Sequence, residues 1–168
     1  MLYCYPEEIY DELIQTMKEE KKICHYLDLP IQHASDRILK RMGRRTTQAE
    51  LVEIVNKLRR EIPDIVLRTT LISGFPGETQ EDHEELMGFV DEMEFDRLGV
   101  FTYSPEEDTP AATMPDQVAE EVKEARRDEI MELQQEISYV KQDISVFIHP
   151  PGPPQGRISG ERNLYDKS

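Results

Sequence analysis

The loop from Ser73 to Thr79, with the sequence SGFPGET, carries the residues of this chain best suited to contact a ligand. Gly74 and Gly77 allow the backbone to approach a bound molecule closely, and the helix expected next would present free N–H groups to it. Glu78 places a carboxylate where a phosphate would sit, and no Lys-Ser or Lys-Thr pair follows, as a nucleotide-binding loop requires. A neutral or zwitterionic ligand therefore fits this loop better than a phosphate. A plain strand-to-helix turn with a capped helix is the alternative.

A second polar group, Gln32, His33 and Ser35, follows another apolar segment. His33 could take part in proton transfer, as histidine side chains do near neutral pH, and a hydrogen-bonded structural histidine is the alternative. No second His, Cys or paired carboxylate stands at a spacing that defines a triad, and Cys4 and Cys24 are too far apart for the close-spaced thiolates of a metal site. The residues alone indicate a ligand-binding site and no acid–base mechanism.

Four strand-then-helix units must position these loops. Strands are expected at residues 2–5, 25–29, 65–72 and 97–103, and helices at 6–21, 35–42, 48–60, from 79 onward and at 116–141. Strands separated by helices favour parallel pairing with right-handed crossovers, in a doubly wound sheet or in part of a (β/α) barrel. In both architectures ligands collect at the carboxyl ends of the strands, where the two polar loops lie.

Two of the expected helices carry signals for their first turn. Thr47 with Glu50, and Thr79 with Asp82, each form a capping-box pattern. In the first expected helix the inward residues are Ile9, Leu13 and Met17. In the helix after residue 79 they are Leu86, Phe89, Val90 and Met93.

The last expected helix, residues 116–141, is long and acidic, with Asp116 as its N-cap. The residues expected to face inward in its first turns are Val118, Val122 and Ala125. Residues 142–168 contain the run HPPGPPQG and are expected to be an irregular or disordered tail. The expected organisation is therefore one unit of residues 1–115, the helix of the same domain, and this tail.

Charge restricts the partners. The chain has 35 acidic and 20 basic side chains and a net charge of −15, so strong direct binding of nucleic acid is not expected, whereas a basic protein surface suits it. No apolar run approaches the roughly 18 residues of a membrane span, and the start lacks a signal-peptide pattern. A cytoplasmic protein that does not contact a membrane is expected.

Two clusters of like charge stand out. One is basic, and the other, from Glu78 to Asp96, contains nine acids and no Lys or Arg. Solvated helix faces explain both; alternatively the acidic faces attract a basic protein and the basic cluster holds a phosphate or a carboxylate. The basic cluster consists of Arg37, Lys40, Arg41, Arg44 and Arg45.

Three segments, residues 26–47, 67–86 and 95–112, closely resemble the methylthiotransferase branch of the radical S-adenosylmethionine (SAM) enzymes. Within that branch, QHASD at 32–36 and RTT at 68–70 resemble the enzymes that modify an aspartate of a ribosomal protein, rather than those that modify tRNA. The resemblance implies an α/β fold that is a partial (β/α) barrel. This chain would supply the last four of six strands, followed by the long helix and the tail.

The resemblance also implies cofactors and site residues. SAM, bound to a 4Fe-4S cluster, would yield a 5′-deoxyadenosyl radical that removes hydrogen from the β-carbon of an aspartate in a basic small-subunit ribosomal protein, before a methylthio group is attached. The residues expected to bind the cofactor are Gln32, Ser35, Ile72, Gly74 and Glu78. No catalytic or metal-ligating residue is assigned.

The sequence departs from the family in its cysteines. The CxxxCxxC motif that holds the cluster is absent, and neither Cys4 nor Cys24 replaces it. This chain alone is therefore expected to be inactive. It begins within a strand-like segment, so it is expected to be part of a longer enzyme, itself expected to be monomeric. Two alternatives are a fragment of a tRNA adenosine methylthiotransferase and a non-catalytic, acidic protein-binding module.

Overall fold

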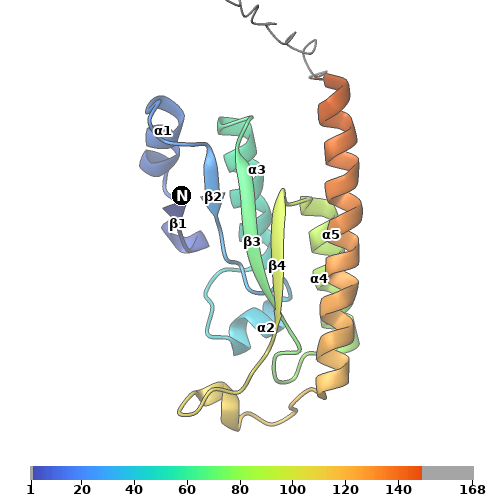
Figure 1. Cartoon of the computed structure of the whole chain (residues 1–168). Helices are drawn as coiled ribbons and strands as arrows, with labels where there is room; N and C mark the ends of the chain where they lie inside the picture. The colour runs from blue at the N-terminus through green and yellow to red at the C-terminus, as the bar shows by residue number, and fades with distance from the viewer. Residues whose placement is uncertain (1, 149–168) are drawn as a thin grey trace, which may run out of the picture.

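The computed structural model describes residues 2–148, in which strands and helices alternate (Figure 1). The elements are β1 (Leu2–Tyr3), η1 (Pro6–Glu8), α1 (Asp11–Glu19), β2 (Tyr26–Asp28), α2 (Asp36–Arg41), α3 (Gln48–Glu61), β3 (Val66–Ser73), α4 (Gln80–Met93), β4 (Arg97–Thr102), η2 (Pro110–Thr113) and α5 (Glu120–Ile148). All four predicted strands are present.

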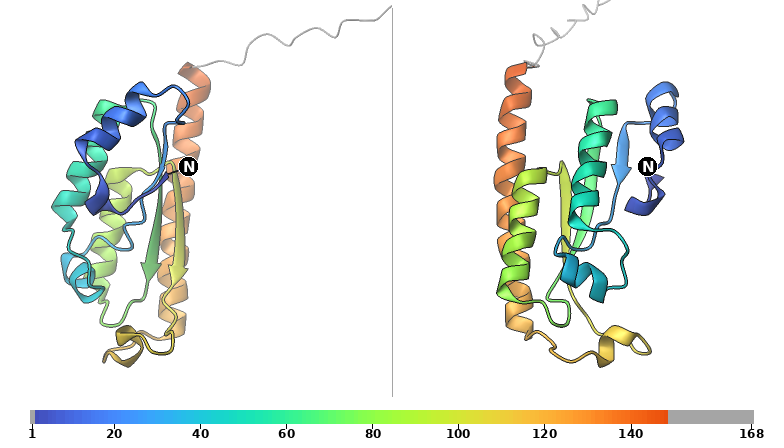
Figure 2. Two further views of the ribbon diagram at one scale, coloured as in Figure 1. Left: turned by 90° about the vertical axis from the view of Figure 1, so that its left-hand side faces the viewer. Right: turned by 180° about the vertical axis from the view of Figure 1, so that it is seen from behind.

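The strands form one parallel sheet in the order β1-β2-β3-β4. Each strand lies beside the one before it, without the reversal of order that a doubly wound sheet requires. Helices α1, α3 and α4 cover one face, and no described helix covers the other (Figure 2, left). Helix α5 runs along β4 and contacts α4. The fold is therefore the predicted partial (β/α) barrel, and the doubly wound alternative is wrong.

The side chains of β3 alternate between the two faces of the sheet. Leu67 and Leu71 are fully buried under the helices, whereas Arg68, Thr70 and Ile72 point to the opposite, open face and are half-buried. This alternation follows from the two-residue period of a strand. The open face therefore carries the half-polar side chains that reach solvent or a ligand.

The two capping boxes form as predicted, at Thr47 and at Thr79. The predicted inward residues of α4, the stripe that begins at Leu86, are all at most 3 % exposed. They join the core that lies between the helices and the covered face of the sheet.

The first predicted helix is interrupted. Ile9 and Tyr10 are extended and separate η1 from α1. The inward side of α1 consists of Ile14 and Met17, and Leu13 is half-buried. Met17 is fully buried as predicted, and Ile9 and Leu13 pack against the core while half-buried. Ile14 was not predicted; it is buried because the extended pair changes the phase of the helix that follows.

The last helix differs from the prediction at both ends. Asp116 has a φ of 63°, and its carbonyl accepts a hydrogen bond from the Gly77 N–H (2.7 Å), so it lies in a turn and the helix begins at Glu120. At the other end the helix continues through Ile148, where irregular chain was expected from residue 142. The remainder of the expected tail, residues 149–168, lies outside the described residues.

The predicted inward face of this helix is also wrong. Val122 is 40 % exposed and Ala125 is exposed, while Val118 precedes the helix. Within residues 120–142, the buried residues of α5 are Lys123, Arg126, Ile130, Gln134 and Ile137. Their spacing is helical, but three of the five are polar, so a search for apolar periodicity selects another face.

Candidate functional site

The polar loop after β2 lies beside the end of β3. Gln32 pairs with Leu71 as an isolated bridge: its N–H donates to the Thr70 carbonyl (3.0 Å), and its carbonyl accepts from the Ile72 N–H (2.8 Å). Gln32 has a φ of 70°, in the left-handed region that non-glycine residues rarely adopt. The bonds of its backbone to β3 hold it in this conformation, half-buried at the carboxyl edge of the sheet.

An apolar cluster lies at the same edge. Phe75 and Tyr103 pack edge to face, with ring centroids 5.2 Å apart, against Ile38 and Ile72. The Tyr103 hydroxyl is buried without a hydrogen-bond partner among the described residues. Ile72, one of the predicted cofactor-binding residues, therefore packs against this buried apolar cluster, and Gln32, another of them, is bonded to the Ile72 backbone.

Glu78 is fully buried and is bonded to its own loop. One carboxylate oxygen accepts from the N–H groups of Gly74 (2.8 Å) and Phe75 (3.2 Å), and the other accepts from Arg126 of α5 (2.9 Å). Both oxygens are thus occupied by protein donors. Glu78 therefore fixes the loop that follows β3 through both of its carboxylate oxygens.

His33 connects this loop with the loop after β2. Its Nδ1 accepts from the Ser35 N–H (2.9 Å), which assigns the ring proton to Nε2, 3.5 Å from the Glu78 carboxylate. Burial alone would raise the pKa of Glu78, but His33, Arg126 and the Gly74 N–H together lower it. His33 is completely buried, in agreement with a hydrogen-bonded structural histidine.

The absence of a side chain at Gly74 leaves room for Lys123 of α5. Its φ is 71°, and a Cβ there would lie 2.2 Å from Cγ of Lys123. Lys123 is buried; its Nζ donates to the Tyr103 carbonyl (2.9 Å) and lies 5.4 Å from the centre of that ring. A ligand was expected to approach the backbone closely at this glycine, and in the structure the Lys123 side chain of α5 does so.

Ser35 and part of the basic cluster hold the start of α4. The Ser35 hydroxyl donates to Asp82 (2.7 Å), to which Arg37 also donates, and Arg37 donates further to the Gly77 carbonyl (2.7 Å). Burial raises the pKa of Asp82, but Arg37, the Thr79 N–H and Ser35 outweigh it and lower that pKa. These residues position the loop rather than hold a free anion.

Two other basic residues of that cluster also contact the protein. Arg41 donates to the Pro76 carbonyl (3.0 Å), and Arg44 lies over the Tyr5 ring at 5.0 Å. Lys40 and Arg45 are exposed. Most of the cluster therefore stabilises the loops at the carboxyl edge.

The structure brings the five predicted residues to this one edge but divides them by role. Ile72 packs against the buried apolar cluster beside Gln32, Gly74 lies against Lys123, and Ser35 and Glu78 form internal hydrogen bonds. Two further members of this network, Lys123 and Arg126, were not predicted, because charged residues in a helix ordinarily face solvent.

The residues described do not fit an iron–sulfur cluster. Cys4 is buried and Cys24 is exposed, and among residues 2–148 no group of three or more His, Cys, Asp or Glu side chains converges on one point. SAM fits better at the carboxyl edge, where the Gln32 side chain forms no hydrogen bond with the rest of the described chain and the Tyr103 hydroxyl lacks a donor or acceptor.

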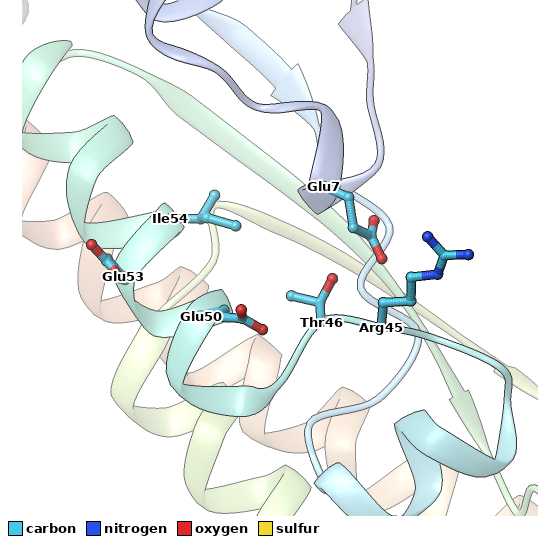
Figure 3. Close-up of a pocket in the computed structure, with 6 residues that line it drawn as sticks. All are labelled: Glu7, Arg45, Thr46, Glu50, Glu53 and Ile54. Carbon is cyan, nitrogen blue, oxygen red and sulfur yellow. The ribbon is translucent and has the colours of Figure 1, made fainter.

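A cavity of about 330 Å³ lies elsewhere, between η1 and α3 (Figure 3). Glu7 and Arg45 lie on one side of it and Ile54 on the other. None of the five predicted site residues lines this cavity, whose remaining lining residues are Thr46, Glu50 and Glu53.

The fold is a partial (β/α) barrel, because its parallel strands follow one another in sequential order and its helices cover one face of the sheet. In such barrels ligands bind at the carboxyl edge, where the polar loops of this chain lie. The family model described as the radical SAM superfamily matches residues 2–90. The chain belongs to the radical SAM superfamily.

Curated relatives show which branch of the radical SAM superfamily the chain resembles. The chain is 67 % identical over 144 residues to the ribosomal protein uS12 methylthiotransferase RimO of Lachnoclostridium phytofermentans, covering 86 % of this chain and 33 % of that protein. It is 51 % identical over 175 aligned residues to RimO of Desulfitobacterium hafniense, covering 99 % of this chain and 39 % of that protein. The resemblance to ribosomal-protein methylthiotransferases is confirmed. The chain spans about a third of the length of these relatives.

Solved structures agree on the fold. Coproporphyrinogen III oxidase (HemN) from Escherichia coli, a radical SAM enzyme, superimposes with a TM-score of 0.62 at 22 % identity, over 83 % of this chain and 31 % of that one. Elp3 from Methanocaldococcus infernus gives a TM-score of 0.59 at 15 % identity, over 79 % and 31 %. Within residues 2–148 no helix has the length and apolar character needed to cross a membrane.

Proposed function

We propose that this chain forms part of a radical SAM methylthiotransferase that attaches a methylthio group to the β-carbon of an aspartate in a small-subunit ribosomal protein. The observation that carries the proposal is the 67 % identity over 144 residues to a protein named a uS12 methylthiotransferase. The activity belongs to a protein about three times as long, so this chain contributes the part of the barrel that holds the cofactor and the substrate.

In this function the carboxyl edge holds SAM. SAM bound there, on receiving one electron from the 4Fe-4S cluster of the whole enzyme, would supply the radical that removes a hydrogen atom from the substrate. The Gln32 amide and the Ile72 side chain contact the cofactor, beside the backbone of Gly74. Ser35 and Glu78 keep the two loops in place through their bonds to Asp82 and to the loop N–H groups.

The partner is a basic ribosomal protein, which suits a chain of net charge −15. The enzyme acts in the cytoplasm as a monomer, without strong direct binding of nucleic acid by this part. Residues 1–115 and helix α5 form one functional domain. The irregular tail expected after the helix is not part of that domain.

Deletion of the encoding gene tests the proposal. Mass spectrometry of uS12 should show loss of the methylthio group from its aspartate, with methylthioadenosine in tRNA unchanged, and a plasmid copy of the gene should restore it. Retention of the uS12 modification with loss of the tRNA modification would overturn the proposal in favour of the tRNA enzyme.

A further inference from the structure

A row of polar side chains crosses the middle of the open face. In the register of the sheet, Tyr3, Asp28, Arg68 and Arg97 are successive neighbours on β1 to β4. Residues paired in a parallel sheet point to the same face, so this row lies on the open side. Ile72 is four residues further along β3, roughly 13 Å at 3.3 Å per residue. The Arg68 side chain extends in that direction, because its guanidinium reaches Thr70 on β3 and lies beside Gly99, the partner of Thr70 on β4.

Arg68 is fixed at one end of its guanidinium. Its Nη1 donates to Asp28 (2.6 Å) and to the Thr70 hydroxyl (3.3 Å), and these are the two hydrogen bonds that the structure gives this side chain. Asp28 is 4 % exposed, whereas the Arg68 side chain is 33 % exposed. A desolvated carboxylate thus holds the arginine in one orientation, and its Nε and Nη2 donors are left for another partner.

A glycine keeps the outer side of this guanidinium uncovered. Gly99 on β4 pairs with Thr70, and a Cβ built on it would come within 3.7 Å of Nη2 of Arg68. A larger side chain at this position would cover the guanidinium. Nη2 of Arg68 therefore lies beside Gly99, where β4 has no side chain to cover it.

The surroundings leave a positive charge at this point. Asp28 offsets one of the two arginines of the row, and Asp96 at the base of β4 is paired with Lys141 (3.2 Å). Arg97, whose Nη1 donates to the Asp96 carbonyl (2.9 Å), adds its own charge. These five groups sum to about one positive charge, in a chain whose net charge is −15.

We propose that Arg68 binds the carboxylate of the substrate aspartate and so determines which residue is modified. The inference rests on the proposed function, because it takes the substrate to be an aspartate side chain. A planar carboxylate matches two parallel guanidinium N–H groups. A phosphate dianion has the same kind of acceptors, but the Asp28 carboxylate repels its two charges more strongly than one.

Titration of the ¹⁵N-labelled 168-residue chain tests this, with NMR detection of the arginine Nε–H signals. The probe is N-acetyl-aspartate N-methylamide, and its asparagine analogue and inorganic phosphate are the comparisons. We expect the Arg68 signal to shift and saturate with the aspartate probe, and the asparagine analogue to bind about tenfold more weakly. An unmoved Arg68 signal, equal binding of the amide, or tighter binding of phosphate would overturn the proposal.

Variants separate binding from folding. Arg68→Lys keeps the charge but loses the paired N–H groups, and is expected to weaken the probe by about fivefold or more. The paired variant Asp28→Asn/Arg68→Gln leaves no unpaired buried charge; it should keep the circular dichroism spectrum of the parent and lose the probe. Arg97→Gln, the matched control in the same row, should change affinity by less than about threefold. Loss of binding in Arg97→Gln alone would refute the assignment to Arg68.

The outcome is distinguishable from failure of the proposed function. If uS12 keeps its modification in the deletion strain while Arg68 binds the aspartate probe, the ribosomal substrate is wrong and the carboxylate site stands. If uS12 loses its modification but the probe does not bind at Arg68, the function stands and this site is wrong.

Discussion

Helices α4 and α5 lie side by side against β3 and β4, yet they bury different kinds of residue. After its first turn α4 buries an apolar stripe that begins at Leu86 and ends at Met93. The buried face of α5 alternates two isoleucines with Lys123, Arg126 and Gln134. In the first helix the buried polar residues, Asp82 and His83, are confined to the first turn, whereas those of α5 extend from Lys123 to Gln134.

The polar atoms of α5 reach the strands and loops of the sheet. Lys123 donates to the Tyr103 carbonyl (2.9 Å), and Gln134 donates to the Phe95 carbonyl (2.9 Å), at opposite ends of β4. Arg126 reaches Glu78 in the loop after β3. Helix α5 therefore positions the candidate site from outside the sheet.

The largest expected effect is that of Arg126→Met. The substitution leaves the buried Glu78 carboxylate without its charged partner, and we expect a loss of about 3–5 kcal/mol in the free energy of unfolding. Urea denaturation followed by circular dichroism measures it. The double variant Glu78→Gln/Arg126→Met should recover most of the loss, because no unpaired charge is then buried.

The neighbouring Arg127→Met is the matched control. Arg127 bonds to the exposed Asp128, and its removal should change stability by less than about 0.5 kcal/mol. If Arg126→Met costs no more than this control, then α5 packs by its isoleucines alone and the two helices do not differ in the way described.

Gly74→Ala tests the contact between α5 and the loop after β3. The methyl group meets Lys123 and the φ is left-handed, so we expect a loss of about 2–4 kcal/mol, measured by urea denaturation. Gly74→Ala should cost less in the Lys123→Ala background than in the parent, because the contact with Cγ at 2.2 Å is removed. Part of the penalty should remain, because the φ is left-handed and the Cβ of residue 123 still lies 2.9 Å from the added methyl group. An unchanged penalty in the double variant would show that Lys123 does not require the glycine.

The first turn of α4 contains a buried acid, and pH tests its role. The pKa of Asp82 is lowered by folding, so its stabilisation is complete above its ordinary value of 3.8 and is lost as pH falls through the lower, folded value. Asp82→Asn should cost about 1.5–3 kcal/mol near pH 7. The difference from the parent should narrow at about pH 3. A pH-independent difference would mean that the charge of Asp82 is unimportant.

Local signals predicted the elements that rest on apolar periodicity and capping. The β-branched run of β3, the capping boxes and the stripe of α4 followed from residue types alone, and the carboxyl edge followed from parallel strands. The five predicted residues lie at one edge, as parallel strands require, but the hydrogen bonds that they form there were not predicted. Glu78 and Ser35 look available in the sequence because their partners, Arg126 and Asp82, are 48 and 47 residues away. Such pairings depend on the tertiary fold.

The same reasoning explains the error at α5, where the apolar Val122 is exposed and the charged Lys123 beside it is buried. A valine that faces solvent contributes little, so Val122→Gln should change the free energy of unfolding by less than about 0.5 kcal/mol. Ile130→Ala, on the buried face of the same helix, should cost about 2–5 kcal/mol. Urea denaturation of the two variants measures the contrast. Equal losses would place Val122 in the core and restore the face that apolar periodicity selects.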